Sequence, residues 1–411
     1  MELIAKQARA AAAAVATLPT HAKDACLRDL ADRIEAGSAR IREANEADLA
    51  EGRSAGLPEA KLRRLEVSNA GVQQMADGLR QIAGLRDPVG EVTREYSAPS
   101  GLQVRKVRAP LGVILMIYEA RPNVTIDAFA LCFKAGNACI LKGGREAAHS
   151  NAVLLGLARD SLGAGGAPEG ALALLTTSDR EQIKALLQLD QYIDLVIPRG
   201  GTELIRFVHQ HSRIPTIQHF QGVCHIFVDE TADPGRAVEI CATAKTSAPA
   251  TCNAVEAILI HRRIAPSFVP DLANRLHRDG VELRGDPTVC ALTQHAVPAR
   301  QDDWGREFLE LIVAVRVVPD LAAAIDHIRA YGSNHTDAIL TNDAENASRF
   351  TAQVQSSCVL VNASTRFNDG FQLGLGAEIG ISTSKIHAYG PMGLEELTTQ
   401  RYVVRGDWQA R

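Results

Sequence analysis

The sequence predicts an α/β protein built around parallel sheets, and three observations support that prediction. The chain has 411 residues, which at about 100 to 200 residues per domain suits two or three domains. From about residue 100, short β-rich runs alternate with helical stretches, the pattern of βαβ units. These runs are almost continuously apolar, as expected for strands that helices cover on both faces.

The first 86 residues are expected to be helical, because apolar residues recur there at helical spacing among alanines and charges. The alternating part then predicts a first series of strands and helices. The helices expected before residue 100 are Leu3–Leu18, Lys23–Asn45 and Glu59–Leu85. The strands of the first series are Gln103–Arg108, Gly112–Tyr118, Ala138–Leu141, Ala171–Leu175 and Tyr192–Ile197, with helices at Ile126–Ala135, Glu146–Leu162 and Arg180–Leu189.

A second α/β series begins near residue 223. Its expected strands include Val223–Val228, Val255–Ile260, Ile312–Val318, Asp337–Leu340 and Cys358–Val361, with helices at Arg236–Ala244, Pro266–Arg278 and Leu321–Ala330. We therefore predict a first domain over residues 1–228 and a second over 229–362. The Gly-, Ser- and Thr-rich stretch that follows is expected to line a site or return to the first domain, around 363–395. The tail is expected to contain a strand at Thr399–Val404.

Composition excludes several classes of protein. Lysine plus arginine number 44 against 48 acidic residues, so the net charge of -4 argues against nucleic acid as a partner. The longest apolar run, Leu111–Tyr118, is far shorter than the roughly 20 residues that span a bilayer, so no membrane segment is expected. Eight cysteines without CxxC spacing suit a reducing cytoplasm, and with no HExxH pattern we expect no metal site.

Cys252 is the candidate nucleophile. It lies among small residues in KTSAPATCNA, Lys245–Ala254, which would give a substrate steric access to the thiol. Lys245 or a backbone N–H could favour the thiolate. Taken alone, a cysteine is more often a buried packing residue, and that alternative stays open.

Three turns that follow expected strands carry further candidates, because ligands bind at the carboxyl ends of parallel strands. Asn123, in the turn after Tyr118, is placed to donate to an oxyanion or to cap a helix. Glycine pairs in KGGRE and PRGGTE would let backbone N–H groups approach phosphates, although each pair is also an ordinary tight turn. With Arg145 they suggest a dinucleotide that carries a 2′-phosphate. The residues of these two turns are Lys142, Gly143, Gly144, Arg145, Gly200 and Gly201.

Together the segments YEARPNVTIDAF, ILKGG, IPRGG, KTSAPATCNA, VNASTRFNDG and FQLGLGAEIGISTSKIHAYGPMGLEELTT resemble the aldehyde dehydrogenase superfamily over nearly the whole chain. Within it they are similar to the branch that reduces an acyl phosphate. The resemblance implies an aldehyde dehydrogenase-like fold: a Rossmann-like NADP-binding domain (1–228), a catalytic domain with the nucleophile (229–362) and a small oligomerisation arm (396–411). It also implies NADPH as cofactor and a homo-oligomer.

The resemblance assigns roles to individual residues. Cys252 matches the nucleophile, and Asn123 the asparagine that forms the oxyanion hole with the Cys252 N–H. Lys142 matches a lysine that contacts the adenosine ribose, and Glu307 a glutamate that holds the nicotinamide ribose. For the substrate's α-carboxylate we expect Arg366 with Ser364 and Thr365, and for its ammonium group Asp369; Arg121 is the rival to Arg366.

The sequence also departs from hydrolytic members of the superfamily, which carry a glutamate base ahead of the strand before the nucleophile. Residues 214–228 contain no carboxylate. A base is needed for water but not for phosphate, which is already an anion. The resemblance thus implies reduction of L-glutamyl 5-phosphate to L-glutamate 5-semialdehyde in proline biosynthesis, with a glutamate kinase as an optional partner. A hydrolytic NAD-dependent dehydrogenase and a non-catalytic nucleotide-binding protein remain the alternatives.

Overall fold

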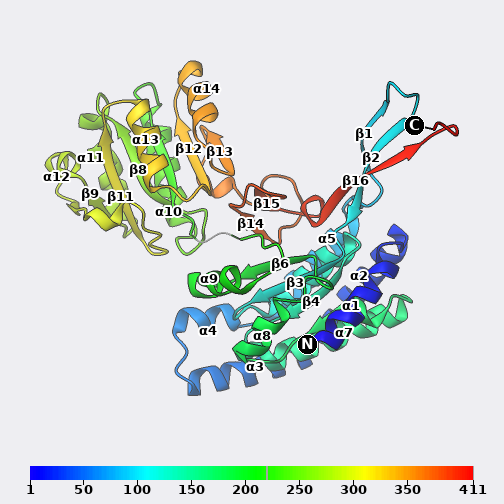
Figure 1. Ribbon diagram of the computed structural model, residues 1–411. Coiled ribbons are helices and arrows are strands. Elements are labelled where there is room, and N and C mark those ends of the chain that lie inside the picture. The colour runs from blue at the N-terminus through cyan, green and yellow to red at the C-terminus, as the bar shows by residue number, and fades with distance from the viewer. Residues whose placement is uncertain (219–220, 411) are drawn as a thin grey trace. The chain divides into compact units, whose positions relative to one another are not determined.

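The computed structural model describes residues 1–218 and 221–410, and the chain divides into two compact units. Unit 1 comprises Met1–Gln218, Leu375–Gly380 and Met392–Arg411, and unit 2 comprises His219–Gly374 and Ile381–Pro391. Figure 1 labels the elements of both. Within the predicted domains, residues 219, 220 and 411 lie outside the described part.

Unit 1 begins with helices, as the sequence predicts, but there are five instead of the expected three, because two expected helices are each divided in two. They are α1 (Glu2–Val15), α2 (Thr20–Ala36), α3 (Ser38–Ser54), α4 (Glu59–Leu65) and α5 (Asn69–Gly84). The break between α2 and α3 falls at Gly37, where a Cβ atom would lie 3.0 Å from the Arg33 carbonyl oxygen. Ser68 starts α5 afresh, because its hydroxyl accepts a hydrogen bond from the Gly71 N–H.

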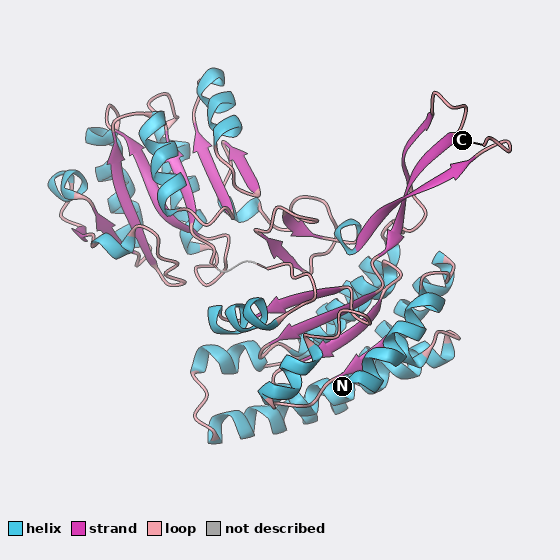
Figure 2. Ribbon diagram, in the orientation of Figure 1, coloured by secondary structure: helices cyan, strands magenta, loops and turns pink. Residues whose placement is uncertain are grey.

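A four-stranded parallel sheet forms the centre of unit 1, in the order β5-β4-β3-β6. The strands are β3 (Val113–Tyr118), β4 (Ala138–Lys142), β5 (Leu172–Leu174) and β6 (Leu195–Arg199), and the helices between and after them are α6 (Pro122–Lys134), α7 (Ala148–Ala164), α8 (Arg180–Leu186) and α9 (Thr202–His211). Every residue of β3 is buried, so helices cover both faces of the sheet. Figure 2 shows this layering by element type.

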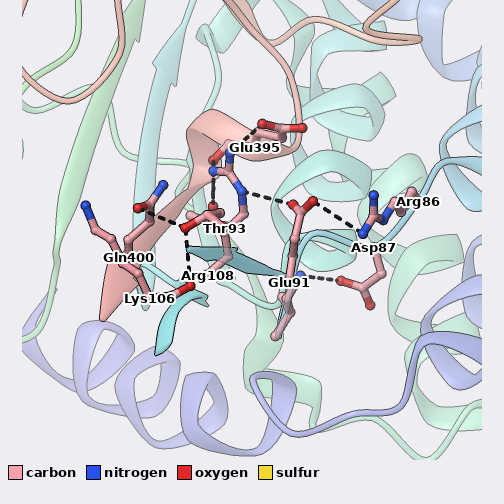
Figure 3. A network of polar contacts seen from close by, with 10 residues as sticks. Arg86, Asp87, Glu91, Thr93, Lys106, Arg108, Glu395 and Gln400 are labelled. Atoms are coloured by element: carbon pink, nitrogen blue, oxygen red, sulfur yellow. Dashed lines mark hydrogen bonds and ion pairs between the residues drawn. The ribbon is translucent and has the colours of Figure 1, made fainter. Parts of the chain in front are cut away.

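The C-terminal strand belongs to a second, antiparallel sheet of unit 1. Strands β1 (Val92–Ser97), β2 (Gln103–Pro110) and β16 (Thr398–Arg405) pair in the order β1-β2-β16, which confirms the strand expected at Thr399–Val404. Figure 3 shows the polar contacts at its base, where the Arg108 guanidinium donates to Glu91 and Glu395. The arm predicted from 396–411 therefore includes the β1–β2 hairpin, which the sequence analysis did not assign to it.

Unit 2 contains a seven-stranded parallel sheet in the order β10-β9-β11-β8-β7-β12-β13. Two apolar clusters fill its faces, one beneath α10 and α11 and one beneath α13 and α14. The strands are β7 (Cys224–Val228), β8 (Val255–His261), β9 (Glu282–Gly285), β10 (Ala296–Pro298), β11 (Ile312–Val318), β12 (Thr336–Leu340) and β13 (Cys358–Val361), and the helices are α10 (Pro234–Thr246), α11 (Ala265–Arg278), α12 (Pro287–Leu292), α13 (Leu321–Tyr331) and α14 (Ala344–Gln353).

The unit boundaries differ from the predicted ones. Strand β7 pairs with β8 and β12, so the chain enters unit 2 before β7 rather than after residue 228. The return to unit 1 is also shorter than residues 363–395, since only 375–380 and the residues from 392 onward belong there. The short strands β14 (Gly380–Ser382) and β15 (Gly390–Met392) pair with each other at these crossings.

Candidate active site

Cys252 lies in the loop that joins α10 to β8, at the amino end of the unit 2 sheet. Its neighbours Ala248, Pro249 and Ala250 are small, and the residue is half-buried. The Cys224 thiol, at the start of β7, donates a hydrogen bond to the Cys252 carbonyl oxygen at 3.2 Å. Burial raises the pKa of the Cys224 thiol well above its ordinary value, so Cys224 keeps the proton that this hydrogen bond uses.

Gly222 makes the tightest backbone contact with the candidate nucleophile. A Cβ atom at this position would lie 2.0 Å from the Cys252 carbonyl oxygen and 2.8 Å from its Cα. The Gly222 N–H donates to a Glu307 carboxylate oxygen at 2.9 Å. Burial raises the pKa of Glu307 even though this hydrogen bond opposes the shift. Glu307, expected to hold a ribose, thus holds the glycine that lies against Cys252.

Lys245 does not present a lone ammonium group to the cysteine loop. Its Nζ lies 2.6 Å from the Glu256 Oε2 atom in β8, and the two side chains are 0% and 1% exposed. Burial lowers the pKa of Lys245 and raises that of Glu256 to about 7, while the attraction between the two groups opposes both shifts. The expected assistance of Lys245 to a thiolate would therefore involve Glu256 as well.

The ASTRF segment of unit 2 contacts the cysteine loop. The Arg366 guanidinium donates to the hydroxyls of Thr251, at 2.8 Å, and Ser247, at 3.3 Å. Ser364 and Thr365 are buried in the same turn, η4 (Thr365–Phe367). The Thr365 hydroxyl has no hydrogen-bond partner in the described part of the chain.

The residues that follow ASTRF, Asn368 and Asp369, make further contacts. Asn253, next to the nucleophile, donates to the Asn368 carbonyl oxygen at 2.9 Å. Asp369 accepts hydrogen bonds from the backbone N–H groups of Phe371 and Gln372. Its carboxylate thus closes a local turn in this structure.

In unit 1, the three predicted turns meet at one edge of the sheet. Strands β4, β3 and β6 are adjacent and parallel, so the turns after Lys142, Tyr118 and Arg199 are neighbours. Burial lowers the pKa of Lys142, and the negative charges of Glu146 and Glu119 partly offset this shift. Arg145 is exposed beside the first turn.

The glycines of these turns differ in their surroundings. A Cβ at Gly143 would lie 2.5 Å from the Asn151 amide nitrogen, and one at Gly144 would collide with Glu146. A Cβ at Gly200 would lie 2.7 Å from Leu204, whereas one at Gly201 would meet no heavy atom within 4 Å. Gly201 is also the N-cap of α9, a helix start suited to an anion, and in this structure its N–H donates to the Glu119 carboxylate.

Asn123 lies within a helix rather than in a loop. Helix α6 begins at Pro122, one residue earlier, because proline is favoured in the first turn. The Asn123 amide donates to the Asp127 carboxylate at 3.0 Å and is exposed. Asn123 and the neighbouring Arg121 belong to unit 1, whereas Cys252 belongs to unit 2. The proposed roles of Asn123 and Arg121 stay predictions.

Two carboxylates at the unit 1 edge were not predicted. Glu119 accepts from the Gly201 N–H at 3.3 Å, and Glu146 accepts from the Ala120 N–H at 2.7 Å. Ala120 has a φ of 39°, a conformation that non-glycine residues rarely adopt. Glu119 directly follows strand β3, and Glu146 follows a glycine pair, as Glu203 also does, so position alone does not single them out.

In unit 2, sequence analysis missed Gly222, Cys224 and Glu256. A lone glycine and a cysteine ahead of an apolar strand give no functional signal. Glu256 did carry one: it is a carboxylate within a continuous apolar strand, VEAILI, where a buried charge needs a partner. Among the described residues, no group of histidine, cysteine and acidic side chains could hold a metal ion, and no helix is long and apolar enough to cross a bilayer.

Comparisons with known proteins agree over the whole chain. The aldehyde dehydrogenase family model matches residues 1–296. The γ-glutamyl phosphate reductase of Geobacter metallireducens is 52% identical over 408 residues, which cover 99% of this chain and 98% of the relative. That of Meiothermus ruber is 50% identical over 411 residues, 100% of this chain and 98% of the relative. A crystal structure of γ-glutamyl phosphate reductase from Thermotoga maritima superposes with a TM-score of 0.97 at 40% identity, covering 99% of both chains.

Proposed function

Since this chain is an oxidoreductase that belongs to the aldehyde dehydrogenase family, we propose that it reduces L-glutamyl 5-phosphate to L-glutamate 5-semialdehyde and phosphate in proline biosynthesis, with NADPH as the reductant. The observation that carries the proposal is full-length identity of about half to relatives of that name, together with a half-buried cysteine in a loop that several contacts support. The proposal includes a thioester on Cys252.

In the proposed reaction the Cys252 thiolate attacks the acyl carbon of the substrate. The C–S bond forms, the bond from carbon to the phosphate oxygen breaks, and phosphate leaves with the electron pair. When bound, NADPH supplies the hydride that takes the thioester carbon to the aldehyde level. The sulfur of Cys252 then leaves as thiolate with the C–S electrons, which regenerates the nucleophile.

The oxygen of the acyl group gains negative charge as each tetrahedral species forms. We assign its stabilisation to the Cys252 N–H and the Asn123 amide, and removal of one such donor typically lowers kcat by about 100- to 1,000-fold. The Asn123 amide nitrogen carries two hydrogens and donates one to Asp127, so the other remains available.

The two carboxylates near Cys252 are each held by another group, which supports reduction of an acyl phosphate rather than base-assisted hydrolysis. Glu307 accepts the Gly222 N–H, and Glu256 pairs with Lys245. Residues 214–228, where hydrolytic relatives carry a base, have no carboxylate. Water needs a base before it attacks a thioester, whereas phosphate is released and returns as an anion.

The carboxyl edge of the unit 1 sheet fits a dinucleotide. Open space beside Gly201 at the start of α9 suits a phosphate group, which would replace Glu119 as the acceptor of the Gly201 N–H, and Gly200 allows close backbone approach. We assign Lys142, Gly143 and Gly144 to the ribose side of the cofactor. The exposed guanidinium of Arg145 would bind the 2′-phosphate that distinguishes NADPH, because it can donate two parallel hydrogen bonds to the phosphate oxygens. Glu307 keeps its proposed contact with the nicotinamide ribose.

For the substrate we retain Arg366, which binds the α-carboxylate in the proposal. Its Nε and one Nη donate to Ser247 and Thr251, which fixes the guanidinium while leaving further N–H donors. The Thr365 hydroxyl and Ser364 lie in the same turn and would add polar contacts. Asp369 would meet the ammonium group, with Arg121 as the alternative carboxylate ligand.

The test is the reverse reaction: NADP reduction with L-glutamate 5-semialdehyde, with and without phosphate, in the parent chain and in Cys252→Ala. The proposal expects reduction that requires both phosphate and Cys252. Reduction without phosphate that yields glutamate would instead identify a hydrolytic dehydrogenase. A folded chain that reduces no NADP under either condition would refute the assigned reaction.

We also propose a homo-oligomer that forms through the β1–β2–β16 sheet. This sheet exposes Val92, Tyr96, Tyr402 and Val404, and a three-stranded sheet needs an apolar face covered to be stable. Sedimentation of the full chain with Tyr402→Ser and Val404→Ser, which removes exposed apolar side chains and keeps β16, would test the oligomer. Association with a glutamate kinase, which would shield the labile acyl phosphate, is tested by co-sedimentation. Because all eight cysteines carry thiols, a reducing compartment such as the cytoplasm suits the enzyme.

A further inference from the structure

A buried ion pair closes the base of the loop that carries Cys252. Lys245 lies in the last turn of α10 and Glu256 is the second residue of β8, so the loop runs between them. Their charged atoms are 2.6 Å apart, and the side chains are 0% and 1% exposed. Neither side chain can touch a substrate in solution. Any effect of the pair on the reaction must therefore pass through the residues that it holds.

The same pair holds a second segment. The other Glu256 oxygen, Oε1, accepts the backbone N–H of Leu309 at 3.3 Å. The Lys245 ammonium lies 6.0 Å from the centre of the Phe308 ring, within the range of a cation–π contact. Glu256 thus bridges the base of the cysteine loop and residues 307–309.

The second segment leads back to the nucleophile. Glu307, one residue before Phe308, accepts the Gly222 N–H, and Gly222 lies directly against the Cys252 carbonyl group. Cys252 is therefore supported from two directions. Lys245 and Glu256 close the base of its own loop. Gly222 packs against its backbone and donates to Glu307, which is next in sequence to the segment that Glu256 holds.

Stability alone does not account for this pair. Removing two charges from water is costly, and apolar residues of similar volume often replace a buried ion pair without loss of stability or with a gain. Burial raises the pKa of Glu256 to about 7, which reflects that cost. A carboxylate, however, can accept from Lys245 and from the Leu309 N–H at once, whereas an apolar side chain can fix neither of them.

We propose that Lys245 and Glu256 act as a positioning pair, which fixes the Cys252 loop and the Glu307–Leu309 segment relative to each other so that the thiolate meets the acyl carbon in the reactive geometry. This proposal rests on the function proposed above, in which Cys252 is the nucleophile. Without the pair, we expect a lower reaction rate, because a displacement of reacting atoms by about 1 Å can slow a reaction about 100-fold.

The test uses the full chain with the double substitution Lys245→Met/Glu256→Leu, which keeps the volume of the pair and removes its polar contacts. We expect a urea midpoint close to that of the parent but a kcat about 10- to 100-fold lower, with the KM for phosphate less affected. The rate at which iodoacetamide alkylates Cys252 should fall as well. That rate does not depend on the identity of the substrate.

A matched control is Lys23→Met/Asp87→Leu, which removes another buried lysine–carboxylate pair, in unit 1. It should leave kcat and the alkylation rate unchanged, which shows that losing a buried ion pair does not by itself slow the reaction. Glu256→Gln serves as a second, nearly isosteric variant. It retains an oxygen acceptor for Leu309 but removes the charge, so its kcat should lie between those of the parent and the double variant.

Parental kcat and parental alkylation in the Lys245→Met/Glu256→Leu chain would overturn the proposal. If the double variant does not fold, Glu256→Gln decides, and parental values there would overturn it equally. Failure of the proposed function has a different signature, because the parent chain would then reduce no NADP, would not require phosphate, or would keep its activity as Cys252→Ala. An inactive Cys252→Ala with a fully active double variant rejects the positioning pair alone.

Discussion

Gly222→Ala should lower activity strongly, because a single methyl group would enter the space of the nucleophile's backbone. The added Cβ would lie 2.0 Å from the Cys252 carbonyl oxygen, 2.7 Å from its carbonyl carbon and 2.8 Å from its Cα. Contacts of a Cβ below 3.0 Å essentially never occur. All three atoms belong to the backbone, so no side-chain rotation relieves the collision.

The magnitude follows from the displacement. To restore a contact of 3.0 Å, Gly222 and Cys252 must separate by about 1 Å, and a misplacement of that size lowers the rate by about 100-fold. The separation also strains the Gly222–Glu307 hydrogen bond and the Cys224–Cys252 hydrogen bond. Overpacking of this kind typically lowers the free energy of unfolding by about 1–3 kcal/mol.

The assay combines kcat for the reverse reaction, the iodoacetamide alkylation rate of Cys252 and the urea midpoint. Gly156→Ala is the control, because a Cβ there meets no atom within 4 Å and lies inside α7. This control should keep the parental kcat and gain about 0.5–1 kcal/mol of stability. The reasoning is refuted if Gly222→Ala keeps the parental kcat and alkylation rate, since the backbone contact would then be irrelevant to the reaction.

Three further predictions concern unit 1. Gly143→Ala places a Cβ 2.5 Å from the Asn151 amide nitrogen, which should lower the free energy of unfolding by about 1–3 kcal/mol. NADP binding, measured by fluorescence titration, should weaken by about tenfold or more. Unaltered binding would contradict the cofactor assignment. Lys23→Met leaves the Asp87 carboxylate buried without its ion-pair partner, so the free energy of unfolding measured in urea should fall by about 3–5 kcal/mol. A fall of less than about 1 kcal/mol would show that other partners of Asp87 compensate for the lost lysine. Burial raises the pKa of Asp127 to about 6, so the folded state favours the protonated carboxyl, and ionisation destabilises the fold as pH rises from about 4 through 6. Asp127→Asn should therefore stabilise the chain above pH about 7 and have little effect below about 4. Equal effects at both pH values would contradict that pKa.

Most strands of both parallel sheets could be predicted because burial on both faces leaves a continuous apolar run. Strands β9 and β10, at one end of the unit 2 sheet, are partly exposed and were not predicted. Val113–Tyr118 and Val255–His261 are buried at every residue, and both appear in the sequence as such runs. Strand β1 could not be found in this way. All six of its residues are exposed, and it is a strand because β2 pairs with it, which is not a local property.

The candidate site shows the same division between local and tertiary information. Cys252 was identifiable because accessibility of a nucleophile depends partly on small neighbours in sequence. The contacts that fix it come from Gly222, Glu307 and Cys224, which approach from other elements and which no local pattern assigns together. Asn123 was expected in the turn after Tyr118 or as a helix cap, whereas the helix already begins at Pro122, because proline is favoured in a first turn.

The pairing of β2 with β16 has a consequence for synthesis of the chain. The Arg108–Thr398 contact in this sheet joins residues 290 positions apart, with all of β7 to β15 between them. At a translation rate of about 5–20 residues per second, β2 emerges from the ribosome roughly 15 to 60 s before its partner. During that interval the nascent chain exposes one unpaired edge of the β1–β2 hairpin, a template for mispairing with another chain. Chaperone demand during expression should therefore be greatest before the last residues are translated, and truncation just ahead of β16 should make the product prone to aggregation.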